Sequence, residues 1–361
     1  TDSKSNTMTM ISDLTINGNL TILNGVLDTD VHDIDIGGDW KNLAGPDGFL
    51  ENENYVNFMG ANDADINSGE TFYTLALSKT ITGYDALEIK SGQTITVTND
   101  LNLIDGGLEM NDNTTIDVAG NVTIMSGAGL NMYNDANVAL IVGGNWDNYN
   151  TYYNASGVGF HPGNGTVSFD GTDDQDLNTA ATHEEFFNLV VNKPSHNLRT
   201  FDNLYIWGDF QALNFALVNP VPSLNHYFFG DVYIGPLGYL HSNETSYIFR
   251  GTNDQEYEML GSTAMMAYMN VLIDKTPAKS AFAPEKDGEG TVLNYQTDNG
   301  KAGTVTLKSG LRLLNGILTI DEGTLVVNGN TIEADDGIII NDGGTITVGA
   351  NGVLELDDGG H

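Results

Sequence analysis

Val167-Ser-Phe-Asp-Gly171 is followed by Phe186-Phe-Asn-Leu-Val-Val-Asn-Lys193, and a degraded copy of this pair occurs twice more in the 361-residue chain. The other copies are Val56-Asn-Phe-Met-Gly60 with Phe72-Tyr-Thr-Leu-Ala-Leu-Ser-Lys79, and Tyr247-Ile-Phe-Arg-Gly251 with Tyr268-Met-Asn-Val-Leu-Ile-Asp-Lys275. Self-similarity of this kind identifies a repeat architecture, so we interpret the chain as a series of related units. We expect Phe58, Phe169 and Phe249 to occupy equivalent inward-facing positions, and the closing Lys193 to emerge at a corner.

The residues around these copies alternate between apolar and polar types. Leu14 to Leu27 shows this alternation, broken by Asn-Gly pairs that favour tight turns because Gly and Asn accept positive φ. No segment of convincing length is patterned as a helix. We therefore predict an all-β protein, folded as a parallel, right-handed β-solenoid built from degenerate repeats of short strands. With coils of about 20 residues, a solenoid absorbs unequal repeat lengths as whole coils, whereas the alternative, an array of two-sheet sandwiches, would need long loops.

Other short motifs keep a fixed order within each unit. An apolar octet such as Leu101 to Leu108 is followed by Gly-Gly-Asx-Trp, the Phe-x-Gly segment, an acidic turn and the aromatic-led strand that ends in Lys. The predicted solenoid units are 1–93, 94–195, 196–300 and a partial unit 301–361. The third unit is expected to carry an extra coil, and a surface loop near 276–300, where two prolines and a run of charges lie.

Acidic residues dominate the charge of the chain, with 49 Asp and Glu against 13 Lys and Arg and a formal net charge of −36. Nucleic acid and anionic lipid are bound by neutralising phosphates, so this charge argues against both as partners. Zero cysteines exclude a disulfide framework, a Cys-ligated metal and a Cys nucleophile. No apolar run reaches the roughly 18 residues of a membrane span. Because Thr1 opens neither a signal peptide nor a basic leader, we expect a mature segment with no direct membrane span.

Three elements of the second unit resemble the repeats of giant surface proteins of the Bacteroidota that are exported by the type IX secretion system. They are Gly144-Asn-Trp146, Pro162-Gly-Asn-Gly-Thr-Val-Ser-Phe-Asp-Gly171 and Phe186-Phe-Asn-Leu-Val-Val-Asn-Lys193. The first unit matches this pattern less closely, and the third carries Phe210 in place of the Trp. The resemblance implies a secreted, adhesin-like segment on the bacterial cell surface, and it supplies no catalytic residues. Surface glycans and other cell-surface or secretion-system proteins are the partners that it implies.

An acidic turn follows each Phe-x-Gly segment, and its carboxylates are candidate ligands for Ca²⁺. Carboxylates at positions i and i+2 beside carbonyl-rich glycine turns suit a hard cation that takes about six to eight oxygen ligands. The candidate residues are Asp63, Asp65, Asp173, Asp174, Asp176, Asp254 and Glu256. The alternative is that Asp and Asn occupy these turns for backbone reasons alone, since no complete Ca²⁺-binding loop is present. No other cofactor is predicted.

Catalysis is not predicted. The histidines are scattered and form neither a His-Glu-x-x-His pair nor a nucleophile-and-base set, and no base stands beside the acidic turns in the sequence. Trp40, Trp146 and Trp207 are either sugar-stacking platforms or aromatics packed beside Gly-Gly backbone, and we favour packing. The sequence thus predicts an extracellular structural or adhesive segment that displays or spaces binding surface. The alternative is a carbohydrate-binding or carbohydrate-degrading β-helix protein.

Overall fold

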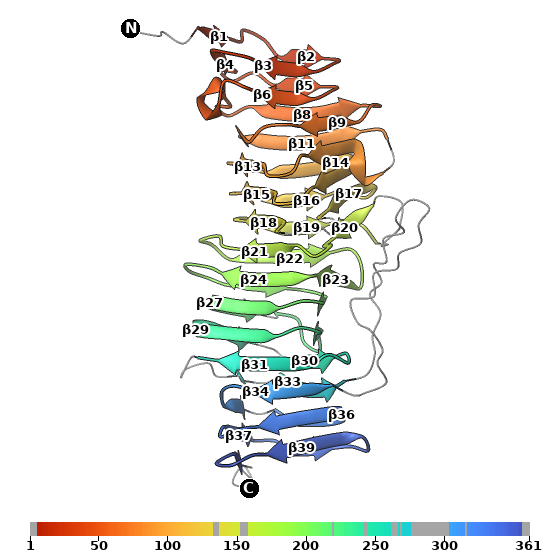
Figure 1. Cartoon of the computed structure of the whole chain (residues 1–361), viewed down its shortest axis with the longest axis vertical. Coiled ribbons are helices and arrows are strands. Elements are labelled where there is room, and N and C mark those ends of the chain that lie inside the picture. The colour runs from red at the N-terminus through yellow and green to blue at the C-terminus, as the bar shows by residue number, and fades with distance from the viewer. Residues whose placement is uncertain are drawn as a thin grey trace. The chain divides into compact units, whose positions relative to one another are not determined.

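The structure is a computed structural model, and it describes residues 6–81, 83–132, 137–151, 158–218, 220–241, 244–260, 266–267, 269–275, 303–314 and 316–355. The chain is all-β, with 2% of its residues in helices and 58% in strands, and its parallel strands form a β-solenoid of about 13 turns (Figure 1). The predicted fold class is therefore confirmed, and the sandwich alternative is wrong. The predicted loop near 276–300 lies outside the described residues.

Two compact units make up the chain: Thr1–Val167 with Thr179–Ala181, and Ser168–Asn178 with Thr182–His361. We call them unit 1 and unit 2. The finer division into four solenoid units stays a prediction.

Unit 1 contains twenty short strands and two single-turn 3-10 helices among its described residues. The strands are β1 (Thr7–Thr9), β2 (Leu14–Ile16), β3 (Leu20–Ile22), β4 (Val26–Asp28), β5 (Ile34–Ile36), β6 (Trp40–Asn42), β7 (Phe49–Leu50), β8 (Tyr55–Gly60), β9 (Ala64–Ile66), β10 (Glu70–Phe72), β11 (Thr74–Lys79), β12 (Leu87–Ile89), β13 (Thr94–Val97), β14 (Leu101–Met110), β15 (Thr115–Val118), β16 (Val122–Ile124), β17 (Ala128–Asn131), β18 (Ala139–Val142), β19 (Trp146–Asn148) and β20 (Gly159–His161). The 3-10 helices are η1 (Pro46–Gly48) and η2 (Tyr84–Ala86).

Unit 2 contains the remaining strands, of which the first two also contribute residues to unit 1. The strands are β21 (Thr166–Phe169), β22 (Gln175–Thr179), β23 (His183–Phe186), β24 (Asn188–Asn192), β25 (Leu198–Thr200), β26 (Asn203–Ile206), β27 (Phe210–Val218), β28 (Asn225–Phe228), β29 (Val232–His241), β30 (Thr245–Arg250), β31 (Gln255–Met259), β32 (Met266–Ala267), β33 (Met269–Asp274), β34 (Thr304–Leu307), β35 (Leu311–Leu314), β36 (Leu318–Val327), β37 (Thr331–Ala334), β38 (Ile338–Ile340), β39 (Gly344–Val348) and β40 (Val353–Glu355).

Within each unit, successive coils contribute strands to three walls. In unit 1 one wall runs from β2 through β5, β8, β11, β14 and β16 to β19, and every pair in it is parallel. In unit 2 one wall runs from β23 through β26, β28, β30, β33 and β36 to β38 in the same way. Paired residues are offset by one coil, for example by 19 residues between Thr9 and Asp28, by 23 between Asp176 and Arg199 and by 30 between Asn131 and His161. The predicted coil length of about 20 residues is thus close to the observed one.

One step along unit 2 is much longer than the others. Strand β31 pairs with β34, and residues Asp254 and Thr304 at this step are 50 positions apart in the sequence. The additional residues include 276–302, which lie outside the described residues. Because a coil contacts only its neighbours, an insertion between two strands leaves the pairing on either side intact.

The core follows from the period of two along each strand. In β5 and β8, Ile34, Ile36, Val56 and Phe58 point inward and are fully buried, while the residues between them are partly exposed. The expected inward position of the repeat anchors is confirmed, since Phe169 is also fully buried and Phe249 is 4% exposed. Each wall therefore delivers one continuous apolar column to the interior, as a solenoid requires.

The Gly-Gly pair of the Gly-Gly-Asx-Trp motif is required by the close approach of neighbouring coils. A Cβ atom on Gly143 would lie 2.4 Å from the carbonyl oxygen of Ala119, and one on Gly144 would lie 2.4 Å from the carbonyl carbon of Gly120. The amides of both glycines donate hydrogen bonds to the coil below, each at 2.7 Å. A side chain at either position would force the two coils apart.

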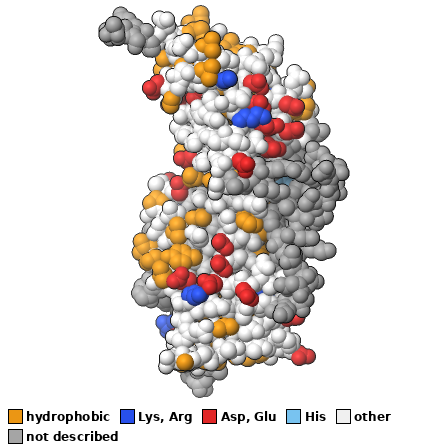
Figure 2. Space-filling view, viewed as in Figure 1, with side chains coloured by type: hydrophobic (Ala, Val, Ile, Leu, Met, Phe, Trp, Pro, Cys, Tyr) orange, Lys and Arg blue, Asp and Glu red, His pale blue; other side chains and the backbone are white. Residues whose placement is uncertain are grey.

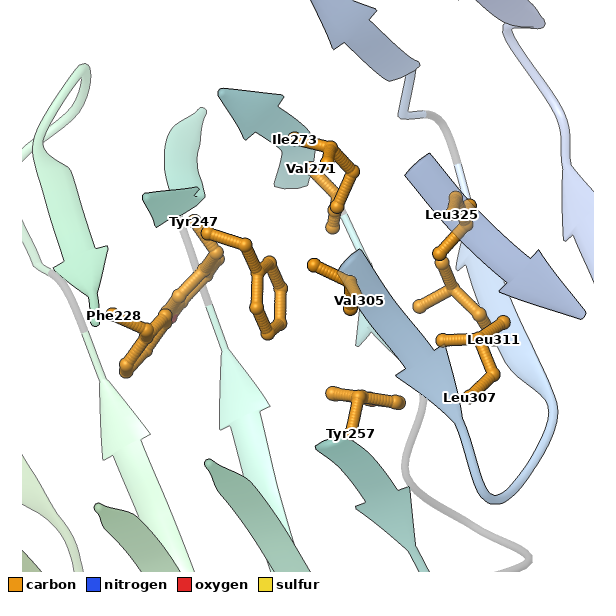
Figure 3. A pocket seen from close by; sticks show the side chains of 10 residues that line it. Phe228, Tyr247, Tyr257, Val271, Ile273, Val305, Leu307, Leu311 and Leu325 are labelled. Carbon is orange, nitrogen blue, oxygen red and sulfur yellow. The ribbon is translucent and has the colours of Figure 1, made fainter. Parts of the chain in front are cut away.

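Unit 2 also contains a small cavity in its apolar core. It has a volume of about 10 Å³ and is lined by aromatic and aliphatic side chains of several coils. Figure 3 shows Tyr247 on one side of this space and Leu325 on the other. A void of this size with apolar walls lacks the polar partners that an ordered water needs, so we expect it to be dry.

Candidate functional site

Lys79 is fully buried, and three backbone carbonyls surround its ammonium group. Its Nζ donates hydrogen bonds to the carbonyl oxygens of Gly37 at 3.1 Å, Met59 at 3.1 Å and Asn62 at 2.7 Å. Met59 and Asn62 belong to the turn that follows Phe58. Gly60 lies in this turn with φ +92°, a conformation that favours glycine, and the register places Lys79 beside it. We call this arrangement of turn carbonyls around a lysine the lysine bracket.

The two other repeats contain the same bracket with a glutamine added. Lys193 donates to the carbonyl oxygen of Gly171 at 2.8 Å and to Oε1 of Gln175. Lys275 donates to the carbonyl oxygen of Arg250 at 3.4 Å and to Oε1 of Gln255. Both lysines are buried. The expectation that Lys193 emerges at a corner is therefore wrong, because backbone and amide oxygens solvate the ammonium group inside the core.

Burial changes the acidity of these lysines. It lowers the pKa of Lys193 to about 8 and that of Lys275 to about 7, although nearby carboxylates, Asp174 and Asp254 first among them, act in the opposite direction. Burial also lowers the pKa of Lys79. Burial disfavours the charged ammonium form, because the hydrogen bonds to neutral oxygens do not fully replace the hydration that the group has in water.

The acidic turn of unit 1 lies beside its bracket, where the negative charge of Asp63 favours the charged form of Lys79. Asp65 forms an ion pair with Lys90 at 2.9 Å, and its backbone N–H donates to Oδ1 of Asp39 at 3.0 Å. Both contacts of Asp65 thus run along the solenoid axis to neighbouring coils.

The acidic turns of unit 2 have comparable partners. Arg199 of the next coil pairs with Asp176 at 2.6 Å and with Asp174 at 3.5 Å. Glu256 pairs with Lys308 at 2.8 Å. The remaining candidates are placed as follows: Asp174 Oδ1 accepts the N–H of Asn197 at 3.0 Å, Asp254 Oδ1 accepts the N–H of Thr304 at 2.9 Å, and Asp173 is exposed.

Carboxylate and amide oxygens elsewhere also accept hydrogen bonds from the neighbouring coil along the solenoid axis. Asp33 accepts the N–H of Tyr55 at 2.8 Å, Asp100 accepts that of Asn121 at 2.7 Å, and Asn121 accepts that of Asn145 at 2.8 Å. Each bond pairs an amide at the start of a strand that would otherwise lack a partner. Among the described residues, no three His, Asp or Glu side chains are grouped so as to hold a metal ion. Ca²⁺ binding by the acidic turns stays a prediction.

An open acidic cleft lies on unit 2. Its volume is about 350 Å³, and Asp209, Asp231, Glu256 and Glu258 line it together with the outward-facing Tyr233. The carboxylates come from three successive coils, because Oδ1 of Asp209 accepts the N–H of Asp231 and Oδ1 of Asp231 accepts the N–H of Glu256, at 3.0 and 2.7 Å. Figure 2 shows few Lys and Arg atoms on the face that it draws.

Charge and burial single out one carboxylate of this cleft. Burial raises the pKa of Asp231 against the opposing hydrogen bond from the Glu256 N–H, and the charges of Asp209 and Glu256 add smaller effects in the same direction as burial. A carboxylate with a raised pKa beside other carboxylates is an arrangement that general acid–base chemistry can use. An acidic cleft with one aromatic ring also suits a cationic or polyhydroxylated ligand. Sequence analysis missed this cleft, because its residues come together only when the three coils are stacked.

The tryptophans are packed rather than displayed. Trp40 is fully buried, has Phe49 at 4.8 Å, and donates its indole N–H to Glu70 at 2.9 Å. Trp146 is also fully buried and has Phe160 at 4.7 Å. The favoured interpretation as packed aromatics is confirmed for both, and each packs edge-on against a phenylalanine.

Trp207 belongs to an aromatic cluster on another wall of unit 2. It is 4% exposed, stacks on Phe229 at 4.0 Å and donates to the buried Glu185 at 2.8 Å. Outside it, Tyr205 and Tyr227 stack at 4.4 Å and are partly exposed. Burial is the main reason that the pKa of Tyr205 rises to about 12. Unlike the buried tryptophans, these two tyrosines present ring surface that a sugar could reach.

None of the helices among the described residues has the length and apolar character needed to cross a membrane. A scan against protein-family models, a search of curated proteins and a search of solved structures each return no match to this chain.

Proposed function

We propose that this chain is a structural or adhesive repeat segment that displays or spaces binding surface on a bacterial cell, without catalysis. The observation that carries the proposal is that polar side chains bond to neighbouring coils along the solenoid axis. Ammonium groups in the lysine brackets, carboxylates in the acidic turns and amides at strand starts are bonded to the neighbouring coil, as at Lys79, Asp65 and Asn121. Groups used in this way hold coils together instead of converging on a substrate.

Export and surface location rest on the sequence. The order of Gly144-Asn-Trp146, the Phe-x-Gly segment and the strand ending in Lys193 resembles repeats of large Bacteroidota surface proteins that use the type IX route. The absence of cysteine and the net charge of −36 are compatible with an extracellular role, since the fold needs no disulfide and a highly charged surface resists aggregation. Surface glycans and other cell-surface or secretion-system proteins are the proposed partners.

The test of this proposal measures binding and turnover separately. The 361-residue chain is incubated with a panel of acidic and neutral polysaccharides, and reducing ends and unsaturated products are assayed while retention on the same immobilised polysaccharides is measured. We expect no turnover. Turnover that is lost in Asp231→Asn or Asp174→Ala would refute the structural proposal, because both changes remove a carboxylate without changing the core.

A second candidate function is carbohydrate binding or degradation at the acidic cleft. The specific observation that favours it is the raised pKa of Asp231 between Asp209 and Glu256 in an open cleft that also contains Tyr233. Hydrolysis of a glycosidic bond uses two carboxyl groups, one that acts as the acid and one that acts as the base or nucleophile. Retention on a polysaccharide that is lost in Tyr233→Ala, with no turnover in the wild type, would establish binding without degradation.

A further inference from the structure

Two of the three lysine brackets place a lysine amine on the carbonyl oxygen of a buried glutamine side chain. Lys193 Nζ donates to Oε1 of Gln175, and Lys275 Nζ donates to Oε1 of Gln255. All four residues are buried, with at most 1% of each exposed. Bulk solvent therefore does not reach either pair, and the amine and the amide stay together as long as the coils are folded.

Neighbouring backbone groups fix the orientation of both glutamine amides. Oε1 of Gln175 also accepts the N–H of Gly171 at 3.0 Å. Nε2 of Gln255 donates to the carbonyl oxygens of Phe228 at 2.9 Å and Gly230 at 2.6 Å. A flipped amide would place donors against donors in the first pair and an oxygen against two carbonyls in the second. The amide carbon Cδ is about 1.2 Å from Oε1, so each bracket holds its amine beside an amide carbon.

Burial also activates the two amines as nucleophiles. A lysine attacks only as the neutral amine, and desolvation raises the neutral fraction. With a pKa of about 7 for Lys275 and about 8 for Lys193, about half of the former and about one tenth of the latter are neutral at pH 7. The N–H of Gly171 can stabilise the negative charge that develops on Oε1 of Gln175 during an attack on Cδ, as a donor in an oxyanion hole does.

We propose that each of these two lysines forms an intramolecular isopeptide bond with its glutamine in the folded chain. The neutral amine attacks Cδ, and the Nζ–Cδ bond forms as the π electrons of the carbonyl move to Oε1. A proton then passes from Nζ to Nε2, the carbonyl re-forms, and the Cδ–Nε2 bond breaks with release of ammonia. The reaction consumes no oxidant, reductant or other co-reactant. It also removes a buried positive charge, which favours the product.

The first repeat provides a reference within the same chain. Ala64 occupies the position of the glutamine, and Nζ of Lys79 donates to three backbone carbonyls instead. None of these partners is a side-chain amide that could release ammonia. Lys79 should therefore remain an unreacted amine.

Each isopeptide bond closes a loop of about one coil, because the joined residues are 18 and 20 positions apart. Force applied to the ends of the chain then loads the covalent bond instead of the hydrogen bonds of the strands inside the loop. Such a crosslink suits a segment that spaces binding surface under load. The proposal itself rests on the chemistry of the brackets, so it stands or fails independently of the adhesive role.

Intact-mass spectrometry of the 361-residue chain detects the bonds directly, because each bond lowers the mass by one ammonia molecule. The folded chain is incubated at about pH 9, where both amines are largely neutral, and its mass is compared with the mass calculated from the sequence. We expect a deficit of two ammonia molecules. Succinimides at Asn-Gly pairs also lose ammonia, so tandem mass spectrometry of proteolytic peptides is needed, and it should find each lysine joined to its glutamine. A chain without joined peptides after incubation would overturn the proposal.

Variants assign the deficit to the brackets. Lys193→Met and Lys275→Met should each remove one ammonia deficit, and the double variant should remove both. Lys79→Met is the matched control and should keep both, since it changes a bracket without a glutamine. A deficit that persists in the double variant would contradict the proposal. Circular dichroism verifies that each variant is folded, and the joined peptides of the wild type are an observation that depends on no variant.

The reaction also has a consequence for titration. A reacted Lys275 carries no ionisable amine, so any effect of this amine on the pH dependence of stability belongs to chain whose mass shows no deficit. Measuring both quantities on one sample therefore distinguishes the two forms.

Discussion

Replacing Lys79 with Met tests whether the lysine bracket holds the coils of unit 1 together. Met keeps the length and apolar character of the lysine stem, so the packing of the stem is largely preserved. The change removes three hydrogen bonds, at 3.1, 3.1 and 2.7 Å, and leaves the carbonyls of Gly37, Met59 and Asn62 facing an apolar side chain. Lys79 is fully buried, so bulk solvent does not reach the position of its ammonium group.

The magnitude follows from the number of bonds lost. A buried acceptor left without a partner costs about 1–3 kcal/mol, and the low end applies here because a carbonyl oxygen has a second lone pair for other donors. Three acceptors at about 1 kcal/mol each give a loss of about 3 kcal/mol. Met also removes the free-energy cost of burying an ammonium group, which acts against this loss. We expect this gain to be smaller than the loss, because the hydrogen bonds of Lys79 already offset much of that cost.

Lys41→Met is the matched control, because Lys41 is exposed and the substitution changes the net charge by the same amount. It should change stability by less than about 0.5 kcal/mol. Native-state hydrogen exchange with mass spectrometry reports the opening free energy of β8 and β11 separately from that of β15 to β18. We expect Lys79→Met to lower protection in β8 and β11 first, because a solenoid transmits damage only to adjacent coils. If Lys79→Met is as stable as Lys41→Met, the bracket contributes nothing and the reasoning is refuted.

Three further predictions concern pH, the core and calcium. The pKa of Lys275 is lowered to about 7 in the folded state, so between pH 7 and the ordinary lysine pKa the unfolded chain binds more protons than the folded chain. Lys275 therefore adds stability as the pH rises through this range. The urea midpoint should accordingly rise less steeply from pH 7 to pH 9.5 in Lys275→Met than in the wild type. Phe169→Ala should cost about 3–5 kcal/mol and reduce hydrogen-exchange protection only in neighbouring coils; uniform loss over both units would indicate one cooperative globule. Ca²⁺ should raise the melting temperature no more than NaCl of equal ionic strength, because Asp174 already bonds Arg199 and an N–H group; a larger gain that Asp174→Asn abolishes would establish a metal site.

The solenoid was predictable because its determinants are periodic and local. The alternation from Leu14 to Leu27 specifies which side chains point inward, and the three Phe-x-Gly copies show that one unit is reused. The same phase places Lys193 inward after Leu189 and Val191. Because Lys193 closes the strand, we expected it at a corner. That expectation failed because the oxygens that solvate the buried ammonium group belong largely to the backbone, which leaves almost no signature in a sequence. A sequence signal for the buried lysine was available in Gln175. Gln255 occupies the equivalent position in the third repeat, and Ala64 occupies it in the first repeat.

The contacts of the acidic turns could not be predicted without the coil length. Asp65 pairs with Lys90 and Asp174 contacts Arg199, and both pairs are separated by one coil. Sequence analysis compared residues within a turn, where carboxylates gather, and therefore considered a cation as their partner. Once an offset of about 20 to 25 residues is known, basic residues one coil away become the first partners to consider. The cleft around Asp231 depends on the same information.

The bracket also explains why the Phe-x-Gly segment and the distant Lys form one motif while the residues between them vary. A turn with its carbonyls directed inward leaves acceptors unpaired in the core, so it requires a donor from the next coil, and the long stem of a lysine reaches that point while packing on the apolar column. Lys79 meets this requirement in register with Gly60, and Lys275 meets it directly after Asp274, which is in register with Arg250. Nothing in the requirement depends on coils further away, which is why the 50-residue step between β31 and β34 is compatible with an intact bracket at Lys275. A chain built from such pairwise contacts is free to vary its loops and outer surfaces, as a segment that presents different binding surfaces on a constant core must do.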